Sequence, residues 1–453
     1  MAEVSTNNQQ NNAINNLSKD LFRTVRLNKG FHIWMGFLSI VLLICLYAYS
    51  IQLRDGLGVA GIRDYVSWGI YISNFVFFVA TSLVGMLVSG VVGLSGQKWV
   101  TPLTRIAEII AVAFAAVAGL VIVSDMGRPE RLAYVFLHGR VQSPILWDVT
   151  VVTTYFLISL LLLYITLIPD LAYGKYNLEG RPKLLQKLYE ILSLGWKGTK
   201  EEVKIIKKST IIMLILIIPV ALSIHTVTSW LFAVTLRPGW DSTIFGPYFV
   251  SGAFVSGLSC LIIAMYFFRK NYKLEEYITD FHFDKVAKLL VLVSLIYLYF
   301  NLNEFLVPGY KMKKFDAAHL HQLFGGEHAL LFWGVQGLGL IIPIILLLIK
   351  PFRKPLPMLI IGIFVLIGSW LKRYIIVVPV QEHPFLPIQH EPSNFMVYSP
   401  TLIEILISIA PLIMVVMIIS VLAKLFPIIP VWETAVHNGL IKDDTEDVVE
   451  NHN

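Results

Sequence analysis

Long apolar runs alternate with short polar segments along almost the whole chain. Ten runs reach about the 20 residues that a helix needs to cross the hydrocarbon core of a membrane. None of them shows the short, alternating apolar and polar pattern of barrel strands, so each is predicted to be a helix that satisfies its own backbone hydrogen bonds. The predicted spans are residues 31–53, 68–93, 102–123, 145–168, 209–236, 247–268, 286–307, 328–349, 356–380 and 401–426.

Composition supports the same fold class. Of the 453 residues, 56% are hydrophobic and only 15% are charged, which lies outside the usual range of soluble globular proteins. We therefore predict an all-α polytopic membrane protein with about ten transmembrane helices. Residues 1–30 are polar and Asn-rich and are predicted to be a disordered tail, and residues 427–453 form a second polar tail.

The basic residues predict the orientation. Most Lys and Arg lie in the two tails and in alternate loops, so the positive-inside rule places both termini in the cytoplasm, as in a multi-pass protein of a bacterial inner membrane. The basic, amphipathic segment 182–209 is predicted to lie on the cytoplasmic membrane surface.

An internal duplication is indicated by weak repeats. The sequence WGIYISNFVFF (68–78) resembles FGPYFVSGAFV (245–255), and SPILWDV (143–149) aligns with HALLFWGV (328–335). These matches predict two four-helix bundles, residues 68–236 and 247–380, flanked by the helices 31–53 and 401–426. Because each unit has an even number of spans, the two repeats would be parallel rather than inverted.

Four ionisable residues lie inside predicted spans: His225, Glu304, Lys372 and Arg373. Each such group costs about 2.5–3.5 kcal/mol on insertion scales, so it is expected to face a cavity or a partner. Two interpretations stay open, a structural clamp in which Glu304 pairs with Arg373, and a proton path through these side chains. Glu327, His328 and Glu404, near the ends of the spans, are expected to form a solvated rim.

Redox cofactors within this chain are not expected. A transmembrane b-type haem usually needs two facing histidines at depth, whereas only His225 lies deep in a span. The two cysteines, Cys45 and Cys260, cannot form an iron–sulfur cluster, and no metal site is predicted.

The segment DMGRPERLAYVFLHGRVQSPILWD (125–148) concentrates polar residues between two spans. Proline and glycine explain the turn, and a helix dipole favours an aspartate near a helix start, so local architecture is one explanation. The other is a pocket for a quinol, whose oxidation needs acceptors for two protons. Asp148 and His138 are the candidate bases, and the candidate binding residues are Asp125, Arg128, Trp147 and, more weakly, Asp241.

The order of DMGRP, SPILWD and the late segment LKRYIIVVPVQEHPFLP resembles the NrfD/PsrC family, the membrane subunits of polysulfide-reductase-like complexes. With ten spans, the chain is most similar to the larger branch that includes the membrane subunits of alternative complex III. The resemblance implies a haem-free subunit that binds menaquinone or ubiquinone near the outer face. It also implies an iron–sulfur partner, accompanied by a molybdopterin-type or multihaem cytochrome subunit, and proton conduction through the bundles. Gly334, where the second repeat might hold an acid, implies one quinone site rather than two.

Two other functions remain possible from the residues alone. A secondary transporter could use the same buried charges, although inverted repeats and broken midplane helices would favour that class more. A passive anchor would hold a peripheral enzyme and bind only membrane lipid. No nucleic-acid partner is expected, and the chain would act as a non-autonomous subunit of an oxidoreductase complex rather than as an enzyme by itself.

Overall fold

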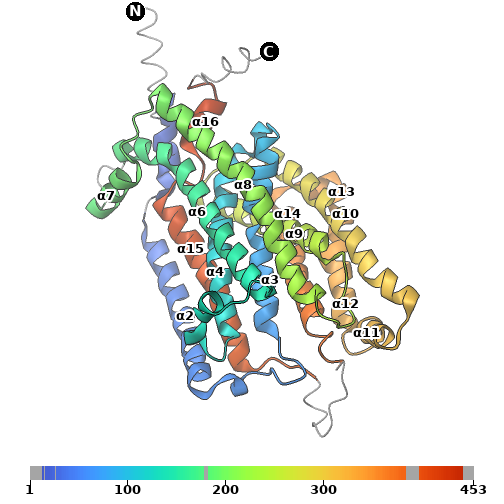
Figure 1. The fold of residues 1–453 in the computed structure, drawn as a ribbon. Coiled ribbons are helices and arrows are strands. Elements are labelled where there is room, and N and C mark those ends of the chain that lie inside the picture. The colour runs from blue at the N-terminus through green and yellow to red at the C-terminus, as the bar shows by residue number, and fades with distance from the viewer. Residues whose placement is uncertain (1–12, 15, 26, 178–181, 384–396, 442–453) are drawn as a thin grey trace, which may run out of the picture.

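Ten helical segments in the described part of the chain are long and apolar enough to cross a membrane, which confirms the ten predicted spans. The computed structural model describes residues 13–14, 16–25, 27–177, 182–383 and 397–441, and these contain no β-strand. Figure 1 shows the spans packed side by side. They are α2 (Lys29–Asp55), α3 (Ile70–Ser82) with the π-helix η3 (Met86–Gly93), α4 (Thr101–Ser124), α6 (Pro144–Asn177), α8 (Lys200–Ala233), α9 (Phe245–Tyr272), α10 (Asp280–Lys311), α12 (Ala329–Gln336) with the π-helix η6 (Gly337–Ile341) and α13 (Ile342–Leu348), α14 (Pro355–Val377) and α15 (Leu402–Leu425).

The spans form two neighbouring four-helix groups. In the first, α3, α4, α6 and α8 pack in chain order, and α8 also contacts η3. In the second, α9, α10, the α12–α13 span and α14 pack in chain order, and α14 contacts α9. The two groups meet where α3 contacts α9 and α14, while α2 and α15 pack together at the side of α4. These groups correspond to residues 68–236 and 247–380, whereas their origin by duplication stays a prediction.

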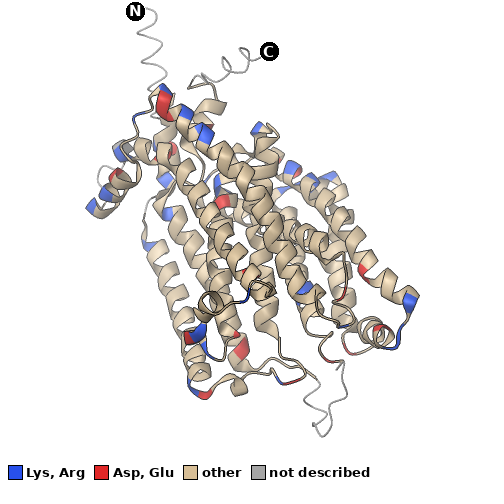
Figure 2. Cartoon of the chain, viewed as in Figure 1, with Lys and Arg blue, Asp and Glu red and all other residues tan. Residues whose placement is uncertain are grey.

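The molecule has two distinct ends. Residues 16–25 and α16 (Val431–His437) lie at one end, which we call the terminal end, and the connections 56–69, 125–143, 234–244 and 312–328 lie at the other, the opposite end (Figure 1). Figure 2 shows that most charged residues gather at these two ends and leave a largely uncharged band between them. Such a band is what a membrane-spanning bundle presents to lipid.

Some helices extend beyond the predicted spans. α6 continues to Asn177, α10 continues to Lys311, and α8 begins at Lys200 instead of 209. A capping box fixes the start of α8, because the Thr199 hydroxyl accepts from the Glu202 N–H and the Glu202 carboxylate accepts from the Thr199 N–H. The basic segment 182–209 is therefore divided between the short helix α7 (Lys183–Leu192) and the first turns of α8.

Parts of both tails are ordered. Residues 16–25 are helical and bury Leu21, Phe22 and Val25, which corrects the prediction of a disordered tail up to residue 30. These apolar side chains supply buried surface that the Asn-rich stretch lacks, and residues 1–12 lie outside the described residues. At the other tail, α16 (Val431–His437) packs against α4 and α6.

Candidate functional site

A buried carboxylate joins two helices of the first group near the opposite end. Asp148 follows the start of α6 by little more than one turn, and only 4% of its surface is exposed. Thr228 on α8 is likewise buried, and its hydroxyl donates a hydrogen bond of 2.5 Å to Asp148 Oδ1. Asp148 therefore lies on the inner face of α6. The helix dipole favours an aspartate near a helix start, but it does not explain why this one is buried.

Trp147, the residue before this carboxylate, forms an aromatic pair with a residue that lines a hollow. The ring of Trp147 meets that of Trp230 edge to face, with 6.4 Å between the ring centres. Trp230 in turn lines a hollow of about 250 Å³ between α8 and α9 together with Asp241. We call it the Trp230 hollow; its lining is Trp230, Ala233, Val234, Asp241, Ser242, Thr243 and Gly246. The structure thus brings Trp147 against Trp230, which lines the hollow with Asp241, whereas Asp148 contacts Thr228, two residues before Trp230 on α8, and is not among the lining residues.

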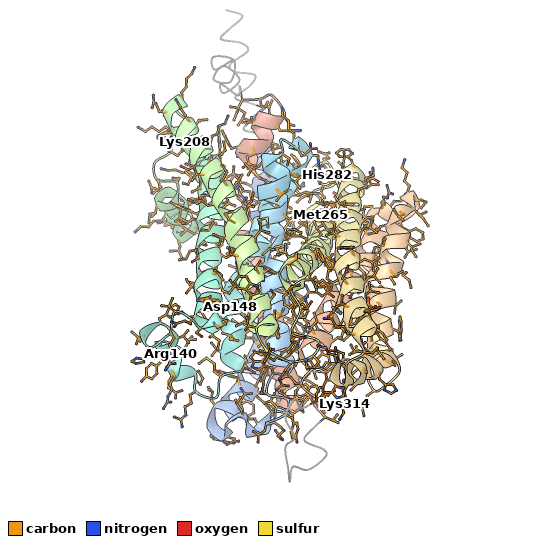
Figure 3. All side chains as sticks on the ribbon, turned by 45° about the vertical axis from the view of Figure 1, so that its right-hand side comes forward. Arg140, Asp148, Lys208, Met265, His282 and Lys314 are labelled. Carbon is orange, nitrogen blue, oxygen red and sulfur yellow. The ribbon has the colours of Figure 1, made fainter. Side chains whose placement is uncertain are left out.

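The other predicted binding residues lie elsewhere. His138 and Arg128 are exposed on the segment that joins α4 to α6, and the His138 ring packs edge to face on Tyr134 at 5.1 Å. Figure 3 shows Arg140, on the same segment, at the edge of the molecule, while Asp148 lies on α6 within the bundle. No hydrogen bond or ion pair among the described residues links His138 or Arg128 to Asp148.

Asp125 belongs to a second polar cluster at the opposite end. It follows the last residue of α4, and its Oδ1 is buried without a hydrogen-bond partner among the described residues. Burial, together with the nearby charge of Glu404, raises the pKa of Asp125 to about 7. Close by, Tyr71 donates to Gln52, which donates to the backbone oxygen of Ser124.

Two further carboxylates of this cluster are buried rather than solvated. Glu404 is fully buried and accepts hydrogen bonds from the backbone N–H of Gly61 at 2.7 Å and from the Tyr398 hydroxyl at 2.9 Å. Glu382 contacts His328 at 2.7 Å and accepts from the backbone N–H of Tyr398 at 3.1 Å. The expectation of a solvated rim is therefore wrong for Glu404, because backbone donors from a distant loop enclose it.

The second group contains a buried ion pair. Lys372 Nζ on α14 lies 2.7 Å from Glu304 Oε2 on α10, and Tyr248 donates to the same oxygen at 2.8 Å. Tyr248 also contacts Asn301, whose amide donates to Gln336 at 2.6 Å. The predicted partner of Glu304 was Arg373, but Lys372 occupies that position.

Arg373 and His225 face the interface between the groups. Arg373 is 4% exposed, and its one described hydrogen bond runs from Nη1 to the backbone oxygen of Ser369 at 3.1 Å. Both ring nitrogens of His225 are buried without a hydrogen-bond partner among the described residues. Buried polar groups without partners are uncommon in folded proteins.

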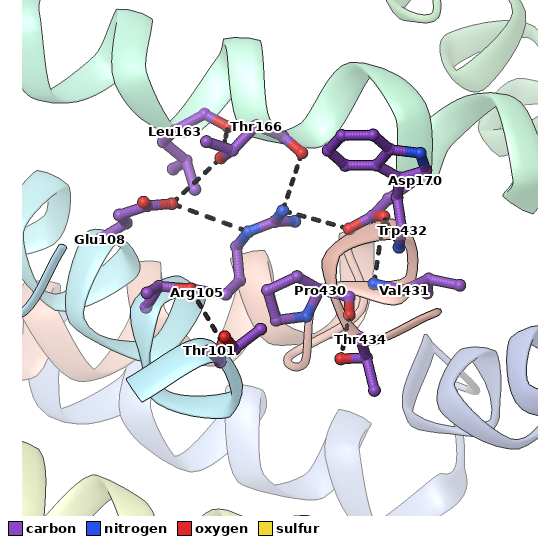
Figure 4. A network of polar contacts seen from close by, with 11 residues as sticks. Thr101, Arg105, Glu108, Leu163, Thr166, Asp170, Pro430, Val431, Trp432 and Thr434 are labelled. Atoms are coloured by element: carbon purple, nitrogen blue, oxygen red, sulfur yellow. Dashed lines mark hydrogen bonds and ion pairs between the residues drawn. The ribbon is translucent and has the colours of Figure 1, made fainter. Parts of the chain in front are cut away.

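A charged network at the terminal end was not predicted. Arg105 on α4 is fully buried and lies 3.1 Å from Asp170 and 3.8 Å from Glu108 (Figure 4). The second carboxylate oxygen of Asp170 accepts from the backbone N–H groups of Val431 and Trp432. This carboxylate thereby attaches α16 to the first group.

The sequence held a usable signal for this network. Arg105 and Glu108 are three residues apart inside a predicted span, so they share one helix face. On α6, polar side chains recur at intervals of seven and four residues along the buried face, and these are Asp148, Tyr155, Ser159, Thr166 and Asp170. A helical polar stripe inside an apolar run marks the face that is turned away from lipid.

No group of three or more His, Cys, Asp or Glu side chains in the described ranges could hold a metal ion. The Trp230 hollow suits a different ligand, because it combines an aromatic wall with a carboxylate and hydroxyl groups. A flat ring bearing two oxygens matches that set of contacts.

Comparison with known proteins matches the chain to one family and to membrane subunits of oxidoreductases. The family model described as "Polysulphide reductase, NrfD" matches residues 58–384. The chain is 27% identical to a selenate reductase subunit of Mesobacillus selenatarsenatis, over 89% of this chain and 95% of that protein. It is 26% identical to a putative dimethyl sulfoxide reductase membrane subunit of Halobacterium salinarum, over 71% and 70%. It is also 24% identical to an Hdr-like menaquinol oxidoreductase integral membrane subunit of Archaeoglobus fulgidus, over 85% and 90%.

Proposed function

Since the chain belongs to the NrfD family of polysulphide reductase membrane proteins, we propose that it is the quinone-binding membrane subunit of a respiratory oxidoreductase complex. The names of its relatives support this proposal, because they are subunits of a selenate reductase, a putative dimethyl sulfoxide reductase and a menaquinol oxidoreductase. The quinone, menaquinone or ubiquinone, would supply the two-electron chemistry.

One structural relationship carries the proposal: Trp147, which precedes the buried carboxylate of Asp148, packs against Trp230, and Trp230 lines the hollow. Thr228 donates a hydrogen bond to Asp148. In this arrangement the aromatic rings would hold the ring of the quinone, and Asp241 would contact one of its oxygens. Asp148 would accept a proton released from the quinol, since a positioned carboxylate can act as a general base.

Electrons have to leave through another subunit. The relatives are named as subunits of oxidoreductases, which supports a redox partner, and we propose that it docks at the opposite end. We propose an iron–sulfur subunit, accompanied by a molybdopterin-type or multihaem cytochrome subunit. The exposed segment with Arg128 and His138 is a candidate contact for it.

Protons would have a separate route. The Glu304–Lys372 pair with Tyr248, together with His225 and Arg373, provides titratable groups between the second group and the interface. We propose these residues as the proton path. We further propose a bacterial inner membrane as the location, with the terminal end in the cytoplasm, because the basic residues favour that side.

The test is Asp148→Asn in the intact complex. We expect quinol-dependent electron transfer to fall about 100-fold or more, as is typical when a general base is lost, while all partner proteins still co-purify. Asp64→Asn, an exposed acid at the same end, is the control and should behave as wild type. Wild-type turnover in Asp148→Asn would exclude Asp148 as the base. His138→Gln should have the smaller effect, because His138 is exposed and outside the hollow.

A further inference from the structure

A second hollow adjoins the first along the surface of α8. It is a groove of about 350 Å³ between α8, α9 and α10, and its lining includes Leu222, Thr226, Pro247, Val250, Val293 and Ile296. On α8 the two hollows share one face, because Leu222, Thr226, Trp230 and Val234 follow one another at intervals of four residues. At 1.5 Å per residue this face is about 18 Å long.

The two hollows adjoin at Gly246 and Pro247, which are consecutive residues of α9. Gly246 lines the Trp230 hollow and precedes Pro247, which lines the groove. A Cβ atom at Gly246 would lie 3.5 Å from the Thr226 methyl group.

The groove offers no free polar group to an occupant. Its two hydroxyl side chains are turned back to their own helices, since Thr226 donates to Leu222 O at 2.8 Å and Ser251 donates to Tyr248 O at 2.9 Å. The rest of its lining is apolar, and two rim residues, Leu222 and Ile296, are exposed on the surface that faces the hydrocarbon. An apolar chain is therefore the ligand class that fits the groove.

The charge in the Trp230 hollow favours a quinol over a phospholipid. The Trp230 hollow contains the Asp241 carboxylate, and no Lys or Arg is among the described residues that line either hollow. A phosphate headgroup would meet a like charge there without a basic partner. A neutral head with hydroxyl groups meets an acceptor and an aromatic ring instead.

We infer that the α8–α10 groove binds the prenyl tail of the quinone whose ring occupies the Trp230 hollow. The inference rests on the proposed function and adds that the tail is a recognised part of the ligand. A methylene group fills roughly the volume of a water molecule, about 30 Å³, so the groove holds roughly a dozen carbon atoms, or about two prenyl units. Because lipid tails are as apolar as the groove, its contribution comes from packing and pre-organisation rather than from transfer out of water.

The experiment compares two quinols in the intact complex. Menadiol has no tail, whereas a prenylated menaquinol has the same ring and a tail. Ile296→Trp and Val250→Trp fill the groove, and we expect each to raise KM for the prenylated menaquinol about tenfold, with menadiol kinetics unchanged. Leu292→Trp, an exposed position one turn away on α10 and outside the groove lining, should change neither. Equal effects on both quinols, or on neither, would overturn the inference.

A binding measurement separates this inference from the proposed electron exchange. Prenylquinone extracted per chain from purified complex should fall in Ile296→Trp and Val250→Trp but not in Leu292→Trp. If that pattern holds while the wild-type complex oxidises neither quinol, the groove assignment stands and the proposed function fails. If phospholipid, rather than prenylquinone, is lost with the groove variants, the tail assignment is wrong.

Discussion

Lys372 and Glu304 form an ion pair of 2.7 Å inside the second helix group, with 3% and 10% of their side-chain surfaces exposed. Lys372 also lies 4.7 Å from the centre of the Phe305 ring. The cation is thus held by the carboxylate and by an aromatic face, and the carboxylate is held by the cation and by the Tyr248 hydroxyl. Removing one partner of such a pair costs stability, because the other charge is then buried without a partner.

Removal of one partner is therefore expected to destabilise the protein. Lys372→Met leaves Glu304 without its cation and should lower the free energy of unfolding by about 3–5 kcal/mol. The double variant Glu304→Gln/Lys372→Met should recover much of that loss, which denaturant titration of the purified protein would measure. Additive effects of the two single changes would contradict the pairing.

Thr228 is expected to act as a positioning residue for Asp148. Thr228→Val keeps the volume and removes the donated hydrogen bond, so quinol turnover should fall about tenfold with the complex intact. Thr228→Ser keeps the hydroxyl and should restore most of the activity, with kcat rather than KM carrying the difference. If serine and valine behave alike, the effect comes from packing and not from the hydrogen bond.

Asp170 should control how firmly α16 is attached. Asp170→Asn weakens two charge-assisted hydrogen bonds to the N–H groups of Val431 and Trp432 and removes a partner of Arg105. We expect amide hydrogen exchange in α16 to become about tenfold faster or more. Asp280→Asn, an exposed acid at the same end, is the matched control. Unchanged exchange in Asp170→Asn would show that apolar packing alone holds the helix.

Glu433 gives the terminal end a pH dependence. Burial, with the negative charge of Glu108 nearby, raises the pKa of Glu433 to about 8 from its ordinary 4.5. A folded-state pKa above the unfolded value means that the folded protein binds the proton more tightly. Stability is therefore highest below about pH 4.5 for this group and is lost as pH rises through 8.

Thermal unfolding measured between pH 6 and pH 9, from about two units below the pKa to about one unit above it, tests this. Glu433→Gln cannot ionise, so its unfolding temperature should decline less with pH than that of the wild type. Parallel pH profiles for the two proteins would assign the dependence to other groups.

The spans were predictable from the sequence, but the partners of their polar residues were not. An apolar run of about 20 residues has few alternatives to a membrane helix, so the ten spans were found. Whether Lys372 or Arg373 pairs with Glu304 could not be predicted from the hydrophobic pattern. Consecutive helical residues lie about 100° apart, so only one of them can face Glu304, and the rotation of α14 depends on packing across the whole bundle.

Long-range contacts limited the other predictions in the same manner. Glu404 looks like a rim residue in the sequence, yet its hydrogen-bond donor at Gly61 lies 343 positions away. His138 is near Asp148 in the chain but lies on an exposed segment, whereas Thr228, 80 positions away, makes the contact. The buried polar stripe of α6 was readable from its spacing and would have indicated Asp148, Thr166 and Asp170 together.

The attachment of α16 also sets an order of assembly during synthesis. Asp170 and Val431 are 261 positions apart, so at translation rates of about 5–20 residues per second the carboxylate waits roughly 15 to 50 seconds for its backbone donors. Until then Asp170 lacks its hydrogen bonds to the backbone of α16, although all four helices of the first group have already emerged from the ribosome. A chain truncated before α16 would stay in this unfinished condition and become a substrate for membrane quality control.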